Sequence, residues 1–386
     1  MDLKLFFSPA GKETSSGIKS KTALFKYLHV FQDEMPEIKE ANIALIGITE
    51  SRGSANNDGV IRAPDNIRKV LYNLKKGFGN YRIVDLGNLR NGMSFEETNG
   101  RVREVCQFLI QNNVLPVLFG GTHAIDYGQY QAYDGLEKLV TVLNVDAFLD
   151  MEDPDGKEPD LDHTNRIFLH EPNYLFHYSH LAYQSYLVNR DTLSVLEKLY
   201  FETHRLGNLH TNLVEMEPVI RNADMLTFDI SAIKSNDAPG SSQAQPFGLT
   251  GEEACQICWY AGLNEKLSSA GFYQYNPDKD DADNKTAKVV ATMIWYFIEG
   301  YYHRQNEQNF KANDYMKYVV SMPADPETLI FYKSKASEKW WMEVPIPKSG
   351  GKYKRDYIIP CTYSDYEKST SGDVPDRYIS TLAKLV

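Results

Sequence analysis

The chain has 386 residues, 42% hydrophobic and 24% charged, which is the composition of a globular protein able to bury a sizeable core. Its formal net charge of −11 argues against nucleic acid or an anionic membrane as the main partner. The N-terminal MDLKLFFSPA lacks the apolar core of a signal peptide, and no apolar run approaches the ~20 residues of a membrane span. Four cysteines do not make a disulfide scaffold. We therefore expect a cytoplasmic protein.

Short apolar runs alternate with helical segments from residue 42 onward. Near-continuous apolar strands separated by helices indicate an α/β fold with a central parallel sheet covered on both faces. We expect an N-terminal extension at 1–41, a main domain at 42–303 and a C-terminal β-rich appendage at 304–386 packed on it. Strands are predicted at 42–48, 81–87, 114–121, 139–146, 223–231 and 270–277, and helices at 19–31, 63–74, 100–113, 191–207, 251–268 and 286–303.

Polar residues stand where several predicted strands end, and parallel sheets collect their functional groups at that edge. His123 follows a strand and a glycine pair, Asp146 and Asp150 follow the next strand, and Asp229 ends a third. Each residue alone is more often structural, for example as a helix cap. Converging carboxylates raise one another's pKa, however, and a divalent ion removes that cost. One imidazole with three carboxylates suits manganese or a similar ion.

Five motifs in order, FGGTH, VDAFLD, FDISAIKSNDAPG, PFGLTGEEA and QYNP, resemble those of the ureohydrolase superfamily of arginases, agmatinases and formimidoylglutamases. The resemblance covers residues 42–300 and is nearest to a formimidoylglutamase-like branch. It implies a three-layer arginase-like fold and hydrolysis of C–N bonds in linear amidines or guanidines at a two-manganese centre. It also implies small-molecule substrates and self-association as trimers or hexamers.

The resemblance assigns the metal ligands residue by residue. The first ion would use His123, Asp146, Asp150 and Asp229. The second would need ligands at positions 148 and 231, where this chain has Phe148 and Ser231. Since neither can replace the expected ligand well, we expect at most one manganese or other divalent ion. Two further departures fall in the substrate pocket, where Thr122 and Gln274 replace acids.

These departures leave two main readings. The first is a formimidoylglutamase-like hydrolase with a degenerate metal centre and weak or altered activity, because one ion must do the work of two. The second is a non-catalytic protein that keeps the fold for assembly or ligand binding; a mononuclear enzyme for an unrelated substrate is a third. Four groups stand near the expected mouth of the site, and one of them could be a proton shuttle, but we interpret them as loop and packing residues: His163, His170, Glu171 and His177. We interpret Asp237 as a loop residue, and Cys255 and Cys258 as packing residues within a helix.

Overall fold

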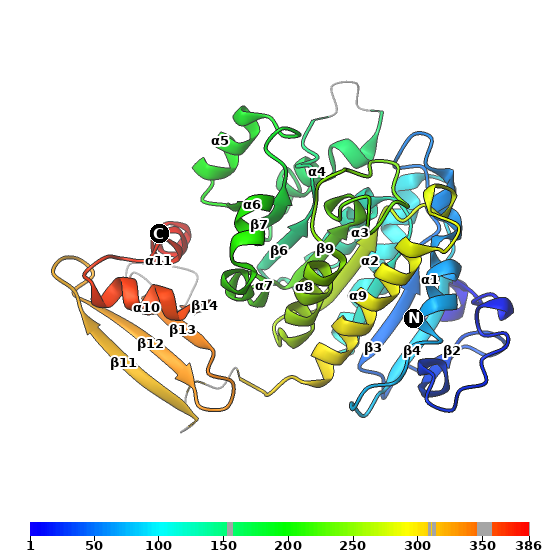
Figure 1. The fold of residues 1–386 in the computed structure, drawn as a ribbon, viewed down its shortest axis with the longest axis horizontal. Helices are drawn as coiled ribbons and strands as arrows, with labels where there is room; N and C mark the ends of the chain where they lie inside the picture. Colours follow the sequence, from blue (N-terminus) through cyan, green and yellow to red (C-terminus); the bar gives the residue numbers. More distant parts are fainter. Residues whose placement is uncertain (153–156, 308–309, 311–313, 346–356, 386) are drawn as a thin grey trace.

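The computed structural model describes residues 1–152, 157–307, 310, 314–345 and 357–385. A ten-stranded sheet runs through the main domain in the order β1-β4-β3-β5-β10-β9-β6-β7-β8, with β2 also paired to β4 (Figure 1). Every pairing in it is parallel except that of β1 with β4. The strands are β1 (Phe7–Ser8), β2 (Leu28–Val30), β3 (Ile43–Gly47), β4 (Ile83–Leu89), β5 (Leu115–Phe119), β6 (Val140–Val145), β7 (Leu175–Tyr183), β8 (Glu202–Arg205), β9 (Met225–Asp229) and β10 (Ser269–Tyr273).

Helices cover both faces of this sheet and give the predicted three layers (Figure 1). Successive residues of β3 point to opposite sides: Leu45 belongs to a core shared with α1, α8 and α9, whereas Ala44 and Ile46 belong to a second core shared with α2. The C-x-x-C pair lies on α8, as expected. The helices are α1 (Ala63–Leu71), α2 (Phe95–Gln111), α3 (Asp126–Gln131), α4 (His163–Phe168), α5 (Arg190–Lys198), α6 (Leu206–Thr211), α7 (Glu217–Arg221), α8 (Gly251–Leu263) and α9 (Lys285–Tyr302). Within the described residues, no helix is long and apolar enough to cross a membrane.

Two predicted helices are wrong. The segment 19–31 forms only a short 3-10 turn, Leu24–Tyr27, and then becomes β2, because pairing with β4 overrides its helical pattern. The segment 191–207 contains α5, but Tyr200 has a left-handed backbone with φ of 56°, and the chain then joins the sheet as β8. Strand β7 was not predicted. The first 41 residues thus supply two strands to the main sheet.

The C-terminal appendage is a separate four-stranded antiparallel sheet in the order β11-β12-β13-β14, covered by two helices. It contacts the main domain through Arg221, whose guanidinium stacks on Trp341 and donates to the Trp340 carbonyl at 3.1 Å. The predicted β-rich character of this region is confirmed. Its elements are β11 (Tyr315–Ser321), β12 (Thr328–Ser334), β13 (Trp340–Val344), β14 (Tyr357–Cys361), α10 (Tyr363–Thr370) and α11 (Asp376–Leu385).

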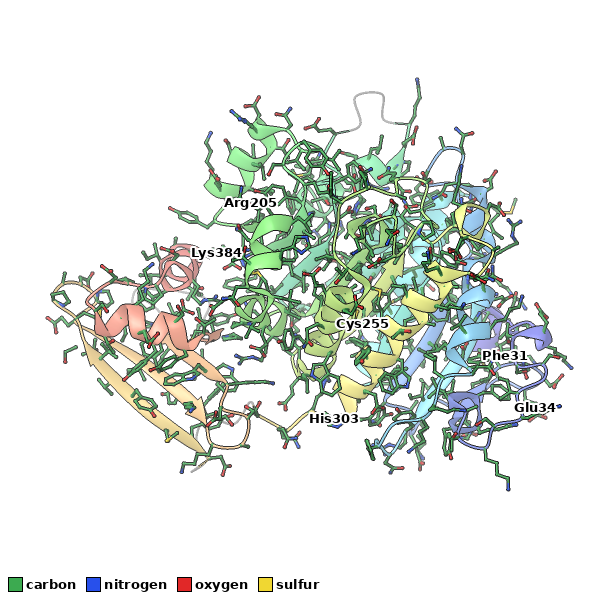
Figure 2. The ribbon with its side chains drawn as sticks, in the orientation of Figure 1. Phe31, Glu34, Arg205, Cys255, His303 and Lys384 are labelled. Carbon is green, nitrogen blue, oxygen red and sulfur yellow. The ribbon has the colours of Figure 1, made fainter. Side chains whose placement is uncertain are left out.

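Lys384 on α11 faces the main domain and hydrogen-bonds Nδ1 of His177 on β7 (Figure 2). Burial lowers the pKa of Lys384 to about 8, although Glu202 opposes the shift. The unfolded chain therefore binds more protons than the folded one between pH 8 and 10.5, and stability rises with pH there. We expect Lys384→Met to stabilise the protein by roughly 2 kcal/mol at pH 7 and to lose that advantage by pH 10.5. Urea unfolding at several pH values measures this; an advantage that stays constant with pH would contradict it.

Candidate metal centre

Four neighbouring strands, β5-β10-β9-β6, bring their carboxyl ends to one edge of the sheet. His123 follows β5, Gln274 follows β10, Asp229 ends β9 and Asp146 follows β6. Because parallel neighbours keep their ends level, these residues meet although up to about 150 positions separate them in sequence. The structure therefore brings the side chains of His123, Asp146 and Asp229 together at one edge of the sheet.

The glycine pair before His123 turns the chain back across the strand ends. Gly120 and Gly121 both have left-handed backbones, with φ of 88° and 72°, which glycine adopts without a side-chain clash. Gly120 N–H donates to the Phe272 carbonyl, and the Gly121 carbonyl accepts from the Gln274 N–H, both at 2.9 Å. These bonds fix the turn against β10 and direct the His123 ring into the site.

The His123 ring faces two carboxylates. Its Nδ1 lies 3.1 Å from Asp146 Oδ2 and 3.1 Å from Asp229 Oδ2. Its Nε2 lies 2.8 Å from the Thr227 hydroxyl, which orients the ring. When Nε2–H donates to Thr227, the lone pair of Nδ1 points at two carboxylate oxygens. Only a proton or a metal cation makes that arrangement favourable.

The pKa values of these buried groups show that it is costly to keep the carboxylates charged next to one another. Burial raises the pKa of Asp146, with the negative charge of Asp150 adding to it, and burial likewise raises the pKa of Asp229 beside Asp146. Burial of the His123 ring opposes its protonation, but the close carboxylates of Asp146 and Asp229, with the charge of Asp126, outweigh it and raise the His123 pKa well above its usual range. Without a cation, the centre would hold a proton instead.

The donor atoms fit a divalent ion. Both His123 Nδ1 and Asp146 Oδ2 are buried and have no hydrogen-bond partner, which is rare for buried polar atoms. Adjacent ligands of a six-coordinate ion with bonds of about 2.1 Å lie about 3 Å apart, and this is the separation of Nδ1 from each Oδ2. One ligand atom from each of His123, Asp146, Asp150 and His163 also lies within 4.8 Å of the others.

The two positions expected to have lost second-metal ligands have other contacts. Ser231 Oγ donates to Asp146 Oδ1 at 2.9 Å, and Ser231 N–H donates to Asp229 Oδ1 at 2.6 Å. The Phe148 N–H also donates to Asp146 Oδ1, at 3.0 Å, and its side chain is partly exposed. The two Oδ2 atoms therefore face His123, while the two Oδ1 atoms accept hydrogen bonds from the protein.

His163, one of the groups expected near the mouth of the site but interpreted as a loop or packing residue, lies inside the site at the start of α4. Its Nδ1 is 2.9 Å from Asp126 Oδ2 and its Nε2 is 3.4 Å from Asp150 Oδ2. Burial opposes protonation, but Asp126 and then Asp150 outweigh it and raise the pKa of His163 to about 9. His163 thus lies against Asp150, whose φ of 47° is left-handed. Several histidines follow Asp150 in the sequence, and no pattern singles this one out.

His180 and Asp160 also lie at the site, and neither was predicted from the sequence. His180 Nε2 is 3.1 Å from the Asp146 carbonyl, and burial lowers its pKa to about 4, so the ring is neutral. Asp160 accepts from Ala124 N–H at 2.8 Å and from Gln274 Nε2 at 2.6 Å. Of the two predicted pocket residues, Gln274 has both ends of its amide engaged, because Oε1 accepts from Asn57. Thr122 Oγ1 is buried without a partner.

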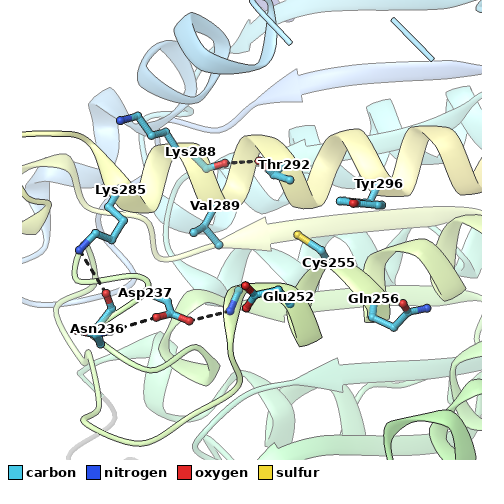
Figure 3. Close-up of a pocket in the computed structure, with 11 residues that line it drawn as sticks. Asn236, Asp237, Glu252, Cys255, Gln256, Lys285, Lys288, Val289, Thr292 and Tyr296 are labelled. Atoms are coloured by element: carbon cyan, nitrogen blue, oxygen red, sulfur yellow. Dashed lines mark hydrogen bonds between the residues drawn. The ribbon is translucent and has the colours of Figure 1, made fainter. Parts of the chain in front are cut away.

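A cavity of about 730 Å³ lies elsewhere, between the first halves of α8 and α9 (Figure 3). Cys255, Lys285 and Lys288 line it, and Asp237 contributes a carboxylate that accepts from Gly251 N–H at 3.0 Å. The predicted metal ligands do not line this cavity. Asp237 shapes the loop before α8, as expected, and the strand-end cluster remains the chemical site.

Comparisons with known proteins agree with this geometry. The model of the arginase family matches residues 41–299. A formimidoylglutamase of Streptococcus gordonii is 24% identical over 295 residues, covering 72% of this chain and 89% of that protein. The crystal structure of Trypanosoma cruzi formiminoglutamase with Mn²⁺ has a TM-score of 0.64 at 19% identity and covers 70% of this chain and 100% of that one. Formimidoylglutamase from Bacillus subtilis has a TM-score of 0.65 at 17% identity and covers 79% and 98%. The chain therefore belongs to the arginase family.

Proposed function

We propose that the protein hydrolyses the C–N bond of a linear amidine, in the manner of a formimidoylglutamase, with a single divalent ion and reduced activity. One observation carries this proposal: a buried Nδ1 and a buried Oδ2 have no hydrogen-bond partner and stand 3.1 Å apart, as two ligands of one ion would. Formimidoylglutamases are among the relatives in sequence, and a formiminoglutamase with manganese is among the relatives in structure, which supports the substrate class and the metal.

His123, Asp146 and Asp229 would hold the ion, and Asp150 would complete the set from its loop. When bound, a divalent ion polarises the substrate and lowers the pKa of water in the site. The protein's own groups keep this set in place: Thr227 orients the His123 ring, and the His163 ring contacts Asp150. These outer contacts matter because partners of metal ligands usually affect affinity by 10- to 100-fold.

The hydrogen bonds of Ser231 and Phe148 support one ion rather than two. A second ion would need the Oδ1 atoms of Asp146 and Asp229, and both already accept protein N–H or O–H groups. Positions 148 and 231 also add no ligand or negative charge. This loss favours slow chemistry, since each tenfold fall in rate corresponds to only about 1.4 kcal/mol.

The same loss supports the alternative, a non-catalytic member of the family that keeps the fold for assembly or ligand binding. Gln274 also supports this alternative. Its Oε1 accepts from Asn57 and its Nε2 donates to Asp160, so its amide has less hydrogen-bonding capacity left for a substrate. Metal content and activity separate the two proposals.

We expect protein purified without chelator, or reloaded with Mn²⁺ after chelation, to contain about one ion per chain by mass spectrometry. Asp229→Asn should abolish loading, because it removes one charge and one ligand atom. Asp237→Asn is the matched control, since its carboxylate lies outside the centre, and should load normally. A site at 100 times its dissociation constant should stabilise the fold by roughly 2.7 kcal/mol in a thermal-shift assay.

The loaded protein should then hydrolyse formiminoglutamate slowly and in preference to arginine or agmatine. Failure to bind an ion or to shift the melting temperature would overturn the proposal in favour of the non-catalytic alternative. Binding of one ion without hydrolysis of any amidine would leave a metal-binding protein that is not an enzyme of this class.

A further inference from the structure

The candidate metal centre has more carboxylates than one divalent ion can balance. Within the described residues, the carboxylates of Asp126, Asp146, Asp150 and Asp229 form salt bridges only with histidines, and that of Asp160 has no salt-bridge partner. One divalent ion would balance two of the five. The remaining charge favours a cationic ligand. The five carboxylates belong to Asp126, Asp146, Asp150, Asp160 and Asp229.

Asp160 differs from the other four because its hydrogen-bond partners are all neutral. Asp160 as a whole is 2% exposed, and its carboxylate accepts from the Ala124 N–H and the Gln274 amide. Ala124 directly follows the metal ligand His123, so Asp160 stands at the wall of the centre. Burial raises the pKa of Asp160 to about 6, which records the cost of keeping this carboxylate charged. Buried charges in proteins are normally paired.

An unused hydroxyl lies next to this carboxylate. Thr122 Oγ1 is fully buried and has no hydrogen-bond partner. A Cβ added to Gly53 would lie 2.4 Å from Thr122 Oγ1 and 3.0 Å from Asp160 Oδ1, so both oxygens pack against the same face of Gly53. The Thr122 hydroxyl therefore has no hydrogen-bond partner and lies beside the Asp160 carboxylate, which has no cation partner. A ligand with several N–H groups could donate to both oxygens.

A chain of amides fixes the direction of hydrogen bonding toward Asp160. Asn276 donates to Asn57 at 2.7 Å, Asn57 donates to Gln274, and Gln274 donates to Asp160 at 2.6 Å. Gln274 has a left-handed backbone with φ of 70°, a strained conformation that is typical of functional sites. The carboxylate at the end of this chain, rather than the amide of Gln274, therefore remains able to accept from a ligand.

We propose that Asp160 binds the positively charged amidinium group of the substrate, with the Thr122 hydroxyl as a second contact. An amidinium carries N–H donors in one plane, and a carboxylate pairs with such a group through charge-assisted hydrogen bonds. This assignment rests on the proposed amidine hydrolysis and names the residue that would select its cationic substrates.

The test is Asp160→Asn, which removes the charge at nearly constant side-chain size. The asparagine oxygen can accept from Gln274 as the carboxylate does, so the chain of amides keeps its direction, which the Asp278 N–H fixes at the far end by donating to Asn276 Oδ1 at 2.9 Å. The probe is acetamidine, a cation, compared with neutral acetamide, and ligand-observed NMR on manganese-loaded protein measures both dissociation constants. We expect Asp160→Asn to weaken acetamidine binding at least about 30-fold, leave acetamide unchanged and shift the melting temperature little.

The double variant Asp160→Asn with Gln274→Glu returns a carboxylate to the adjoining position and should recover much of the acetamidine binding. Equal acetamidine binding by wild type and Asp160→Asn would overturn the assignment, while metal loading and formiminoglutamate hydrolysis by the wild type would still uphold the proposed function. Acetamidine binding that is lost in Asp160→Asn, in a wild type that hydrolyses nothing, would uphold the cation site and overturn the proposed hydrolysis.

Discussion

Introducing Phe148→His with Ser231→Asp should raise manganese content from about one ion per chain towards two. Ser231 now donates to Asp146 Oδ1, and an aspartate there would place a new carboxylate against Asp146 and Asp229. Without metal, this repulsion should lower the melting temperature relative to the wild type. With excess Mn²⁺ the variant should have the higher melting temperature, because a second ion would bind the added carboxylate and the imidazole at position 148. Hydrolysis of formiminoglutamate should then rise at least about 100-fold.

Phe148→His with Ser231→Asn is the matched control, since asparagine has nearly the size of aspartate but no charge. It should remain at one ion. Metal content by mass spectrometry and melting curves with and without Mn²⁺ separate the two variants. A charged variant that also remains at one ion would show that positions 148 and 231 do not correspond to the family's second-metal ligands.

Arg68→Met should destabilise the protein by about 3–5 kcal/mol. Arg68 is fully buried on α1 and pairs with the equally buried Asp85 of β4 through bonds of 2.8 and 2.9 Å. Methionine would fill much of the same volume but would leave Asp85 without its cation. Tyr72 O–H and Gly87 N–H still donate to that carboxylate, at 2.8 and 2.9 Å, and cannot neutralise it. The free energy of unfolding in urea measures the loss.

Arg101 provides the comparison, because it pairs with Glu97 on the surface of α2 at 2.7 Å. Arg101→Met should cost under about 0.5 kcal/mol, as exposed ion pairs of this spacing contribute little. Combining Arg68→Met with Asp85→Leu removes the stranded charge and should recover part of the loss. If Arg68→Met and Arg101→Met proved equally mild, the buried pair would not contribute to stability as its contacts indicate.

Much of the fold followed from the sequence because its strands are buried on both faces and its helices have regular apolar spacing. The ends of β5, β6 and β9 were predictable for the same reason, and His123, Asp146 and Asp229 with them. The segment 191–207 was misread because its pattern suits one long helix, whereas the left-handed Tyr200 allows the chain to enter the sheet as β8. Only the tertiary pairing with β7 decides between the two.

The outer parts of the site were predicted only in part. His163 was among the groups expected near the mouth of the site but was interpreted as a loop or packing residue. Nothing in the spacing of Asp160 shows that the chain after Asp150 returns to the strand ends. The sequence also did not show that Ser231 and Phe148 donate hydrogen bonds to the Oδ1 atoms of Asp146 and Asp229. A residue that cannot bind a metal at position 148 or 231 does not reveal what the neighbouring carboxylates contact instead. Side-chain direction in loops depends on contacts that are distant in sequence.

The position of β10 has a consequence for the order in which the protein can fold during synthesis. β10 lies between β5 and β9 and pairs in parallel with both, yet it is made about 150 residues after β5. Until residues 269–273 have left the ribosome, the strands on its two sides cannot join and the two halves of the metal centre cannot meet. The chain must therefore delay assembly of its core until late in translation. Fragments that end before β10 should expose apolar strand edges and depend on chaperones.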